Sequence, residues 1–116
     1  MFIEVINHAW GQGQTLLMDA SIRGRHEILS LLIEFGATVN QTNSTGAAAL
    51  HCVVCSNRPV TRVAEILIEC GASLEMKTKE GYTALKYAKR RNNRELIRLL
   101  EVKSQEKPQQ ENFPWQ

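Results

Sequence analysis

Apolar and polar residues alternate with a helical period in three stretches of the chain. In the first stretch, the polar residues Glu27, Ser30 and Glu34 lie at spacings of three and four, so they share one face of a helix. The positions between them, and residue 35, are apolar. The later stretches repeat the polar stripe with Arg62, Glu65 and Glu69, and with Glu95 and Arg98. Each stretch therefore predicts an amphipathic helix that buries one face.

A shorter helical segment precedes each of these helices, and the pair recurs as a repeat. The units begin at Gly13, Gly46 and Gly81, at nearly equal intervals. Each unit runs from a polar turn through a short helix, a break and the amphipathic helix. The breaks fall at Gly24, Asn57 and Asn92. Because a helix pair of this size cannot bury its apolar face alone, the sequence predicts a stack of neighbouring units.

Helix ends are marked by glycine and proline. Gly36 and Gly71 follow the amphipathic helices of the first two units, where a residue with a left-handed backbone commonly ends a helix. Pro59 is predicted to lie in the first turn of the helix that follows it, because the missing N–H costs no hydrogen bond there.

The repeat resembles the ankyrin repeat. Its period matches that family's, and it carries the pattern G-x-T-x-L before the first helix and G-A-x-[VL]-N after the second. The resemblance extends over residues 3–101, since Ile6-Asn7 precedes Val39-Asn40 by one period. It implies an all-α fold, a solenoid of stacked helix-turn-helix pairs with projecting hairpin-like turns. The expected divisions are a partial leading repeat at 1–12, repeats at 13–45, 46–80 (with a two-residue insertion) and 81–103, and a disordered tail at 104–116.

The family's Thr-Pro-Leu-His tetrapeptide is incomplete in every copy. Its versions here are Thr15-Leu16-Leu17-Met18, Ala48-Ala49-Leu50-His51 and Thr83-Ala84-Leu85-Lys86. None contains the proline, and none has both Thr and His, whose side chains tie the turn to the repeat in this family. Each missing net hydrogen bond is worth about 1 kcal/mol, and three repeats are near the minimum for a stable stack. We therefore expect a marginally stable array.

Positive charge is concentrated at one end of the chain. Over 116 residues the net charge is only +2, with 43% apolar and 22% charged residues, which is typical of a globular domain. Residues 77–103 carry nine Lys or Arg and three Glu, a local charge of +6, whereas residues 1–76 sum to −3. Lys89 replaces a small residue of the family pattern, which is typical of a capping repeat. The basic end is explained either as the solvated face of this cap or as a surface for an acidic partner, for which a protein patch is favoured over RNA or a phosphoinositide.

We expect a monomer that binds a protein rather than a nucleic acid or a membrane. The chain has no recognised nucleic-acid reader motif, and the aromatic residues near the basic end are limited to Tyr82 and Tyr87. No apolar run approaches the ~20 residues that a membrane span needs. Residues 1–10 contain Glu4 and no cationic stretch, unlike a secretory signal. Three cysteines cannot all pair with one another, so we expect an intracellular location, cytoplasmic or nuclear.

One segment, His51-Cys52-Val53-Val54-Cys55, invites a chemical role. A C-x-x-C pair can exchange disulfides or supply two zinc ligands, and Cys70 and His51 nominally complete four. Because the segment runs along a repeat's first helix, we interpret its thiols as buried or groove-lining apolar residues. Asp19 is the only aspartate, and neither a phosphate-binding glycine loop nor a Ser-His-Asp spacing is present. The sequence therefore predicts no enzyme activity, no metal and no cofactor.

In the ankyrin family, variable positions around the turn glycine and at the end of the first helix line a concave groove. The resemblance places partner-binding residues at the matching positions of this chain: Gln12, Gln14, Ile22, Arg23, Ser44, Thr45, Ala47, Cys55, Ser56, Lys79, Glu80, Tyr82, Arg90 and Arg91. Tyr82, Arg90 and Arg91 form the predicted hot spot, because Tyr and Arg are enriched among residues that dominate binding energy. The alternative is a surface that binds nothing and only spaces other domains.

The resemblance implies a non-enzymatic protein-interaction module, and the alternative is a regulatory or targeting segment of a larger enzyme or effector. Asn40 occupies a hairpin position that an asparaginyl hydroxylase often modifies in this family. Leu32 fits the upstream preference, but Thr38 replaces the preferred acid and weighs against modification. In the tail, Phe113-Pro114-Trp115 is explained either as a short linear motif or as a segment that folds back on the last helix.

Overall fold

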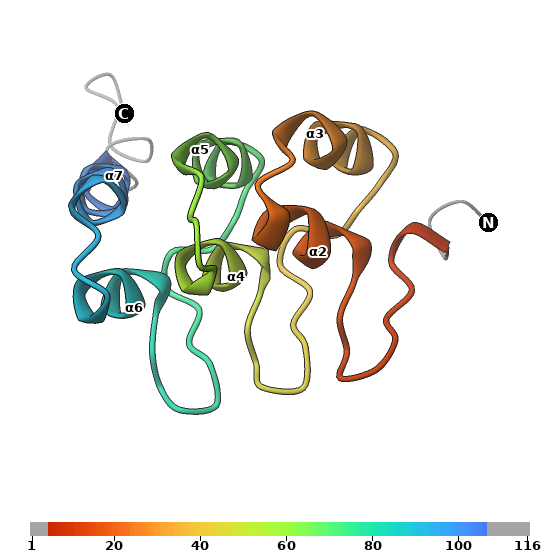
Figure 1. The fold of residues 1–116 in the computed structure, drawn as a ribbon, viewed down its shortest axis with the longest axis horizontal. Helices are drawn as coiled ribbons and strands as arrows, with labels where there is room; N and C mark the ends of the chain where they lie inside the picture. The colour runs from red at the N-terminus through yellow and green to blue at the C-terminus, as the bar shows by residue number, and fades with distance from the viewer. Residues whose placement is uncertain (1–4, 107–116) are drawn as a thin grey trace, which may run out of the picture.

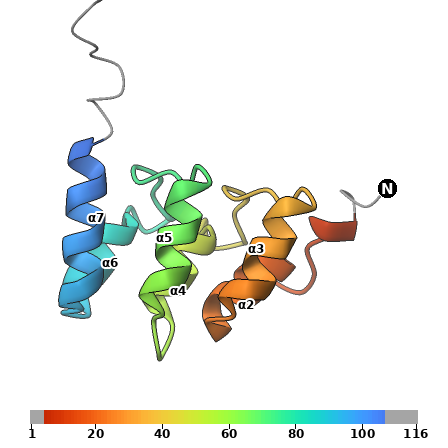
Figure 2. The same ribbon diagram turned by 90° about the horizontal axis from the view of Figure 1, so that it is seen from above.

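The computed structural model describes residues 5–106. Its helices lie in two rows (Figure 1). The first row contains α2 (Leu16–Arg23), α4 (Ala49–Cys55) and α6 (Ala84–Arg90). The second row contains α3 (His26–Glu34), α5 (Thr61–Glu69) and α7 (Arg94–Glu106). Long turns project beyond the first row, and the pairs follow one another in chain order when seen from above (Figure 2). The predicted stack of helix pairs is confirmed.

The core lies between consecutive pairs. Helix α2 packs on α4 and α4 on α6, while α3 packs on α5 and α5 on α7. Ala49 and Ala84, the first residues of α4 and α6, are buried, and their small side chains let neighbouring helices approach closely. The largest fully buried apolar side chains come from all three pairs: Leu17, Met18, Leu29, Leu50, Val53, Val54, Val63, Leu67, Leu96 and Leu100. The helices of each pair also pack on one another, so apolar burial within and between the pairs drives folding.

Neighbouring turns are joined by main-chain hydrogen bonds. The Ser44 N–H donates to the Gln12 carbonyl at 2.8 Å, and the Lys79 N–H donates to the Thr45 carbonyl at 2.9 Å. Gly46 lies at this second junction with a φ of +82°, and a Cβ atom there would come within 2.9 Å of the Lys79 nitrogen. Glycine is therefore required at position 46 both by its backbone conformation and by the closeness of the next turn.

Two asparagines link the segments that follow the second helices. The Asn40 side chain donates to the Gly71 carbonyl at 3.0 Å and accepts from the Ser73 N–H at 2.9 Å. Asn7 makes the same pair of bonds one unit earlier, to the Gly36 carbonyl at 3.1 Å and from the Thr38 N–H at 2.7 Å. Residues near Asn7 therefore occupy the place of a preceding repeat's closing segment.

The first residue of each incomplete tetrapeptide is the N-cap of a first-row helix, α2, α4 or α6. The Thr15 hydroxyl accepts from the Met18 N–H at 3.3 Å, and the Thr83 hydroxyl accepts from the Lys86 N–H at 3.2 Å. Ala48, at the matching position of α4, has no side-chain acceptor. The helix starts are thus capped by a side chain in α2 and α6 and lack this bond in α4.

Two helix boundaries differ from the sequence prediction. Pro59 does not lie in the first turn of a helix, because the two-residue insertion lengthens the connection and α5 begins only at Thr61, after the N-cap residue Val60. Helix α7 continues to Glu106 rather than ending near 103, since no glycine or proline interrupts it before Pro108. Most of the predicted tail, with Phe113-Pro114-Trp115, lies outside the described residues.

The apolar face predicted for α3 is only partly buried. Leu29 is buried and Leu32 is half-buried, but Ile28, Leu31 and Phe35 are exposed. Helical periodicity identifies the apolar residues of a helix but not whether a neighbour covers them. No helix pair of the described segment precedes α2 and α3, so Ile28 and Leu31 face solvent, whereas their matches on α5, Val63 and Ile66, are buried. Phe35 is exposed as its match Cys70 is.

Candidate functional site

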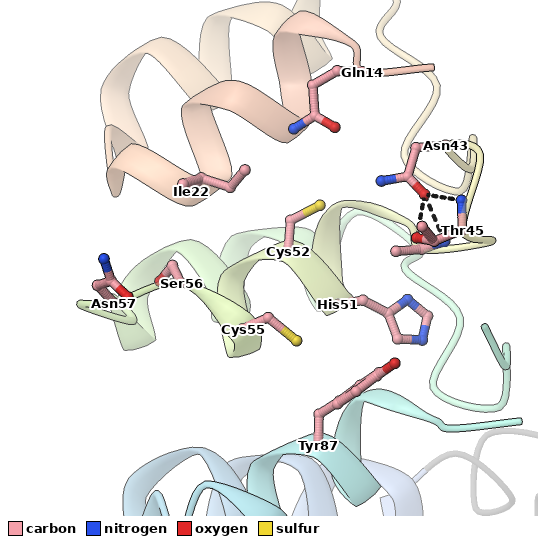
Figure 3. Close-up of a pocket in the computed structure, with 11 residues that line it drawn as sticks. Gln14, Ile22, Asn43, Thr45, His51, Cys52, Cys55, Ser56, Asn57 and Tyr87 are labelled. Carbon is pink, nitrogen blue, oxygen red and sulfur yellow. Dashed lines mark hydrogen bonds between the residues drawn. The ribbon is translucent and has the colours of Figure 1, made fainter. Parts of the chain in front are cut away.

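A groove runs along the first-row helices beside the projecting turns. One cavity in it, of about 400 Å³, opens between the end of α2, the length of α4 and the side chain of Tyr87 on α6 (Figure 3). Its lining combines polar and apolar side chains: Gln14, Ile22, Asn43, Thr45, Ala47, His51, Cys52, Cys55, Ser56, Asn57 and Tyr87. A surface of this kind can hold an extended segment of another molecule.

A second cavity, of about 600 Å³, lies at the basic end of the groove. It shares Cys55 and Tyr87 with the first cavity, so the two are contiguous. Its remaining lining residues are Glu80, Tyr82, Arg90 and Arg91. The groove therefore passes from a small, polar region over α4 to an aromatic and cationic region over α6.

Most residues predicted to bind a partner line one of these cavities. The exceptions are Gln12, Arg23, Ser44 and Lys79. Arg23 pairs instead with Asp19 at 3.0 Å on the surface of α2, whereas Gln12, Ser44 and Lys79 take part in the main-chain bonds between turns. The structure thus separates residues that shape the groove wall from residues that hold the turns together.

Asn43 is a groove residue that the sequence prediction missed. Its side-chain oxygen accepts hydrogen bonds from the Thr45 N–H at 2.9 Å, the Thr45 hydroxyl at 2.7 Å and the Ala47 N–H at 3.0 Å (Figure 3). These bonds fix the turn that presents Thr45 and Ala47 to the cavity. An Asn two residues before Thr45 is a usual turn signal, which could have identified it.

His51 joins α4 to the turns on both sides. Its Nδ1 accepts from the Ala48 N–H at 3.0 Å, so its Nε2 carries the proton and donates to the Met76 carbonyl at 3.1 Å. Burial lowers the pKa of His51 below its ordinary value, although the hydrogen bond to Met76 opposes this shift. A neutral imidazole with both nitrogens engaged is a structural residue rather than a metal ligand or a general base.

The cysteines are free, and their positions do not favour redox chemistry. Cys52 is buried, whereas Cys55 and Cys70 are exposed. Burial raises the pKa of the Cys52 thiol to about 12, and the neighbouring Cys55 adds to the shift. Desolvation also raises the pKa of Cys55, although nearby Arg91 opposes it. A reactive thiol needs a lowered pKa, so these two groups lack the required activation.

Tyr82 lies at the centre of the basic end. The Arg90 guanidinium donates a 2.6 Å hydrogen bond to the Tyr82 hydroxyl, and the Lys86 ammonium lies 5.7 Å from the centre of the ring. Arg91 is oriented separately, because it donates to the Ser56 carbonyl at 3.1 Å just beyond the end of α4. Neither arginine forms a salt bridge with an acid that the structure describes. Both guanidinium groups therefore remain available to an acidic ligand.

Tyr87 connects the two cavities and, like His51 and Asn57, lines the groove although sequence reasoning did not place it there. Its hydroxyl donates to Glu80 at 3.1 Å and lies 3.2 Å from the Thr78 hydroxyl. Its ring packs edge-on against both His51 and Tyr82. The aromatic rings thus form one rigid wall along the groove, which limits the entropy that binding would cost.

Residues 5–106 contain neither a cluster of metal-ligating side chains nor a membrane-spanning helix. No group of three or more His, Cys, Asp or Glu side chains is placed to hold a metal ion. Within the same described range, no helix has the length and apolar character needed to cross a membrane.

Comparison with known proteins identifies the repeat. The family model for ankyrin repeats (three copies) matches residues 3–78. The chain is 35% identical over 85 residues to human BCL-6 corepressor-like protein 1 and 36% identical over 92 residues to the E3 ubiquitin-protein ligase Ufd4 of Drosophila melanogaster. These matches cover 73% and 77% of the chain but only 5% and 3% of the relatives. A putative ankyrin repeat protein of Borreliella burgdorferi is 32% identical over 82 residues, which are 71% of the chain and 36% of that protein.

Proposed function

The chain belongs to the ankyrin-repeat family, and on this premise we propose that it is an interaction module that binds an acidic segment of a protein partner in the groove. An ankyrin-repeat segment is itself non-catalytic, and ankyrin repeats generally bind proteins. We further propose that this chain acts inside the cell, without enzyme activity of its own. The cavity at the basic end carries the proposal.

The two arginines at that end are positioned without being neutralised. Arg90 is held by Tyr82 and Arg91 by the Ser56 carbonyl, so each guanidinium is oriented before a ligand arrives. Glu80 is the one acid in the lining, and its carboxylate accepts from Tyr87 rather than from an arginine. Preorganised guanidinium groups bind carboxylates with two parallel hydrogen bonds, which supports an acidic ligand.

Capture of a partner from native lysate, followed by crosslinking and mass spectrometry, tests this proposal. The variant Tyr82→Ala/Arg90→Ala/Arg91→Ala should lose most of the captured partner. Arg94→Ala/Arg98→Ala is the matched control, because it removes two cations from α7 outside both cavities. Equal capture by the triple variant and the wild type would refute the role of the groove's basic end.

A second candidate is a regulatory or targeting segment of a larger enzyme or effector. It is favoured by the small share of each relative that the chain spans, since two of those relatives are many times longer than the matched region. The intact mass of the native protein, measured after immunoprecipitation, tests it. A mass equal to that of the 116-residue chain alone would exclude this candidate.

A further inference from the structure

The groove changes its charge along its length. Among the described residues, no side chain that lines the first cavity is charged at neutral pH, because its one histidine, His51, is neutral. The second cavity is lined by Arg90 and Arg91 and by a single acid. Since the two cavities share Cys55 and Tyr87, a ligand that follows the groove passes from an uncharged surface to a cationic one.

One row of side chains crosses the three first-row helices and shows the same change. Ile22 on α2, Cys55 on α4 and Arg90 on α6 hold matching positions in the three units. Ile22 and Cys55 line the first cavity, whereas Cys55 and Arg90 line the second. The row therefore runs along the groove from an apolar side chain, through a thiol, to a guanidinium.

Ile22 offers an apolar contact at the uncharged end of this row. It is 41% exposed and lies beside the space between α2 and α4 (Figure 3). An apolar side chain of a ligand laid on Ile22 would remove apolar surface of both molecules from water, which is favourable. A charged side chain in the same place would lose water and meet no opposite charge in the lining of the first cavity. The uncharged end therefore favours an apolar residue.

Side-chain amides in the first cavity suit an extended main chain. Gln14 and Asn43 point into the space between α2 and α4 (Figure 3). Within the described part of the chain, the Gln14 side chain makes no hydrogen bond, and Asn43 uses its side-chain oxygen in the turn but leaves its nitrogen free. Amides donate to carbonyls and accept from N–H groups, and an extended main chain presents both. A helical ligand would use these groups in its own hydrogen bonds.

The length of the row sets the spacing within the ligand. Packed helices lie about 8–10 Å apart, so Ile22 and Arg90, which are two helices apart, are separated by roughly 16–20 Å. An extended chain advances about 3.3 Å per residue. Two ligand side chains that contact Ile22 and Arg90 are therefore about five or six residues apart.

We propose that the groove binds an extended segment with two different ends, an apolar residue over Ile22 and, about five or six residues away, an acidic residue over Arg90 and Arg91. The acidic end rests on the proposed function, whereas the apolar end and its spacing go beyond it. The stretch between the two ends is uncharged, because it lies over Cys55 and the uncharged lining of α4. A partner is thus recognised by its pattern of charge and not by acidity alone.

Fluorescence anisotropy of labelled synthetic peptides, titrated with the full chain, tests the proposal. Each peptide carries two aspartates and a serine spacer, with a leucine either about five or about two residues from the nearer aspartate, in both chain orders. In one chain order, leucine at the longer spacing should lower the dissociation constant by about threefold or more relative to serine at the same position. Leucine at the shorter spacing should give no such gain.

Two isoleucine variants locate the leucine contact. Ile22→Ser should remove the gain and leave the affinity for the serine peptide unchanged. Ile28→Ser is the matched control and should keep the gain, because Ile28 is 46% exposed on α3 and lines neither cavity. If circular dichroism shows that Ile22→Ser is unfolded, Ile22→Gln takes its place in the same titration.

The outcomes separate this proposal from the proposed function. Acidic peptides that bind equally well with leucine or serine, or a gain that survives the change at Ile22, would overturn the proposal and leave the acidic ligand in place. A glutamate at the leucine position that binds more tightly than leucine would also overturn it, since net charge alone would then explain binding. If none of the peptides binds the wild type, the acidic ligand itself is wrong and both proposals fall.

Discussion

The Arg90 guanidinium donates a hydrogen bond to the Tyr82 hydroxyl, and its central carbon lies 5.1 Å from the centre of the same ring. Arg90 thus contacts Tyr82 in two ways, by a hydrogen bond to the hydroxyl and by a cation–π contact with the ring. Because both residues are on the wall of the groove rather than in the core, this pair contributes more to the shape of the binding surface than to folding.

Removing the Tyr82 hydroxyl separates these two contacts. Tyr82→Phe keeps the ring under Arg90 but removes the hydrogen bond, so partner capture should fall about twofold to tenfold, equivalent to about 0.4–1.4 kcal/mol. The midpoint of thermal unfolding should change little, since the lost bond is exposed. Thr38→Val is the control, because it removes an exposed hydroxyl outside both cavities. Undiminished capture by Tyr82→Phe would show that the tyrosine hydroxyl is dispensable.

Ala48→Thr should stabilise the protein. The new hydroxyl would cap α4 as Thr15 and Thr83 cap α2 and α6, adding about 1 kcal/mol to the free energy of unfolding. For a domain of this size, the midpoint of a thermal melt should rise by roughly 4 °C. Thr83→Ala is the reciprocal control and should lower the midpoint by a similar amount. A midpoint that does not rise would contradict the explanation of the missing tetrapeptide contacts.

Stability should fall on mild acidification because of His51. Burial holds the pKa of folded His51 below the ordinary value of 6.5, so the unfolded chain takes up a proton first as pH falls. The stability that depends on neutral His51 is fully present above about pH 6.5 and is lost as pH falls through the lowered pKa of the folded state. Protonation of Nδ1 would also remove the acceptor of the Ala48 N–H.

Urea melts between about pH 7.5 and about pH 5 measure this dependence. The wild type should lose stability across the interval, and His51→Gln should show a flatter profile from a lower starting value. If both proteins give parallel profiles, another group is responsible for the acid sensitivity.

Two turn glycines should respond differently to alanine. Gly46 and Gly81 both have a left-handed φ, but a Cβ at Gly46 would press on the Lys79 nitrogen, whereas a Cβ at Gly81 meets nothing within 4 Å. Gly81→Ala should therefore cost about 1 kcal/mol for the backbone alone. Gly46→Ala should cost about 1 kcal/mol more than that in a urea melt, because the neighbouring turn must also move. Equal losses would show that the close approach of the turns is unimportant.

The repeat made the fold predictable, because the same apolar and glycine positions recur three times and each copy supports the interpretation of the others. The exposure of Ile28 and Leu31 could not be predicted in this way. Their spacing is that of a buried face, and only the three-dimensional order of the pairs shows that nothing in the described segment covers them. Tyr87 was missed for a related reason, since its place in the groove depends on its contacts with His51 and Tyr82 across separate elements.

The side-chain nitrogen and oxygen of Asn40 bond to Gly71 and Ser73, so this link between successive repeats is sensitive to deamidation of Asn40. Deamidation to aspartate would replace the donor that Gly71 needs with a carboxylate oxygen facing a carbonyl oxygen. The bond from the Ser73 N–H would survive, because its acceptor is unchanged. A change of one functional group would thus turn a two-point connection between successive turns into a single bond beside a repulsive contact, and the age of a sample would affect how firmly its turns are joined.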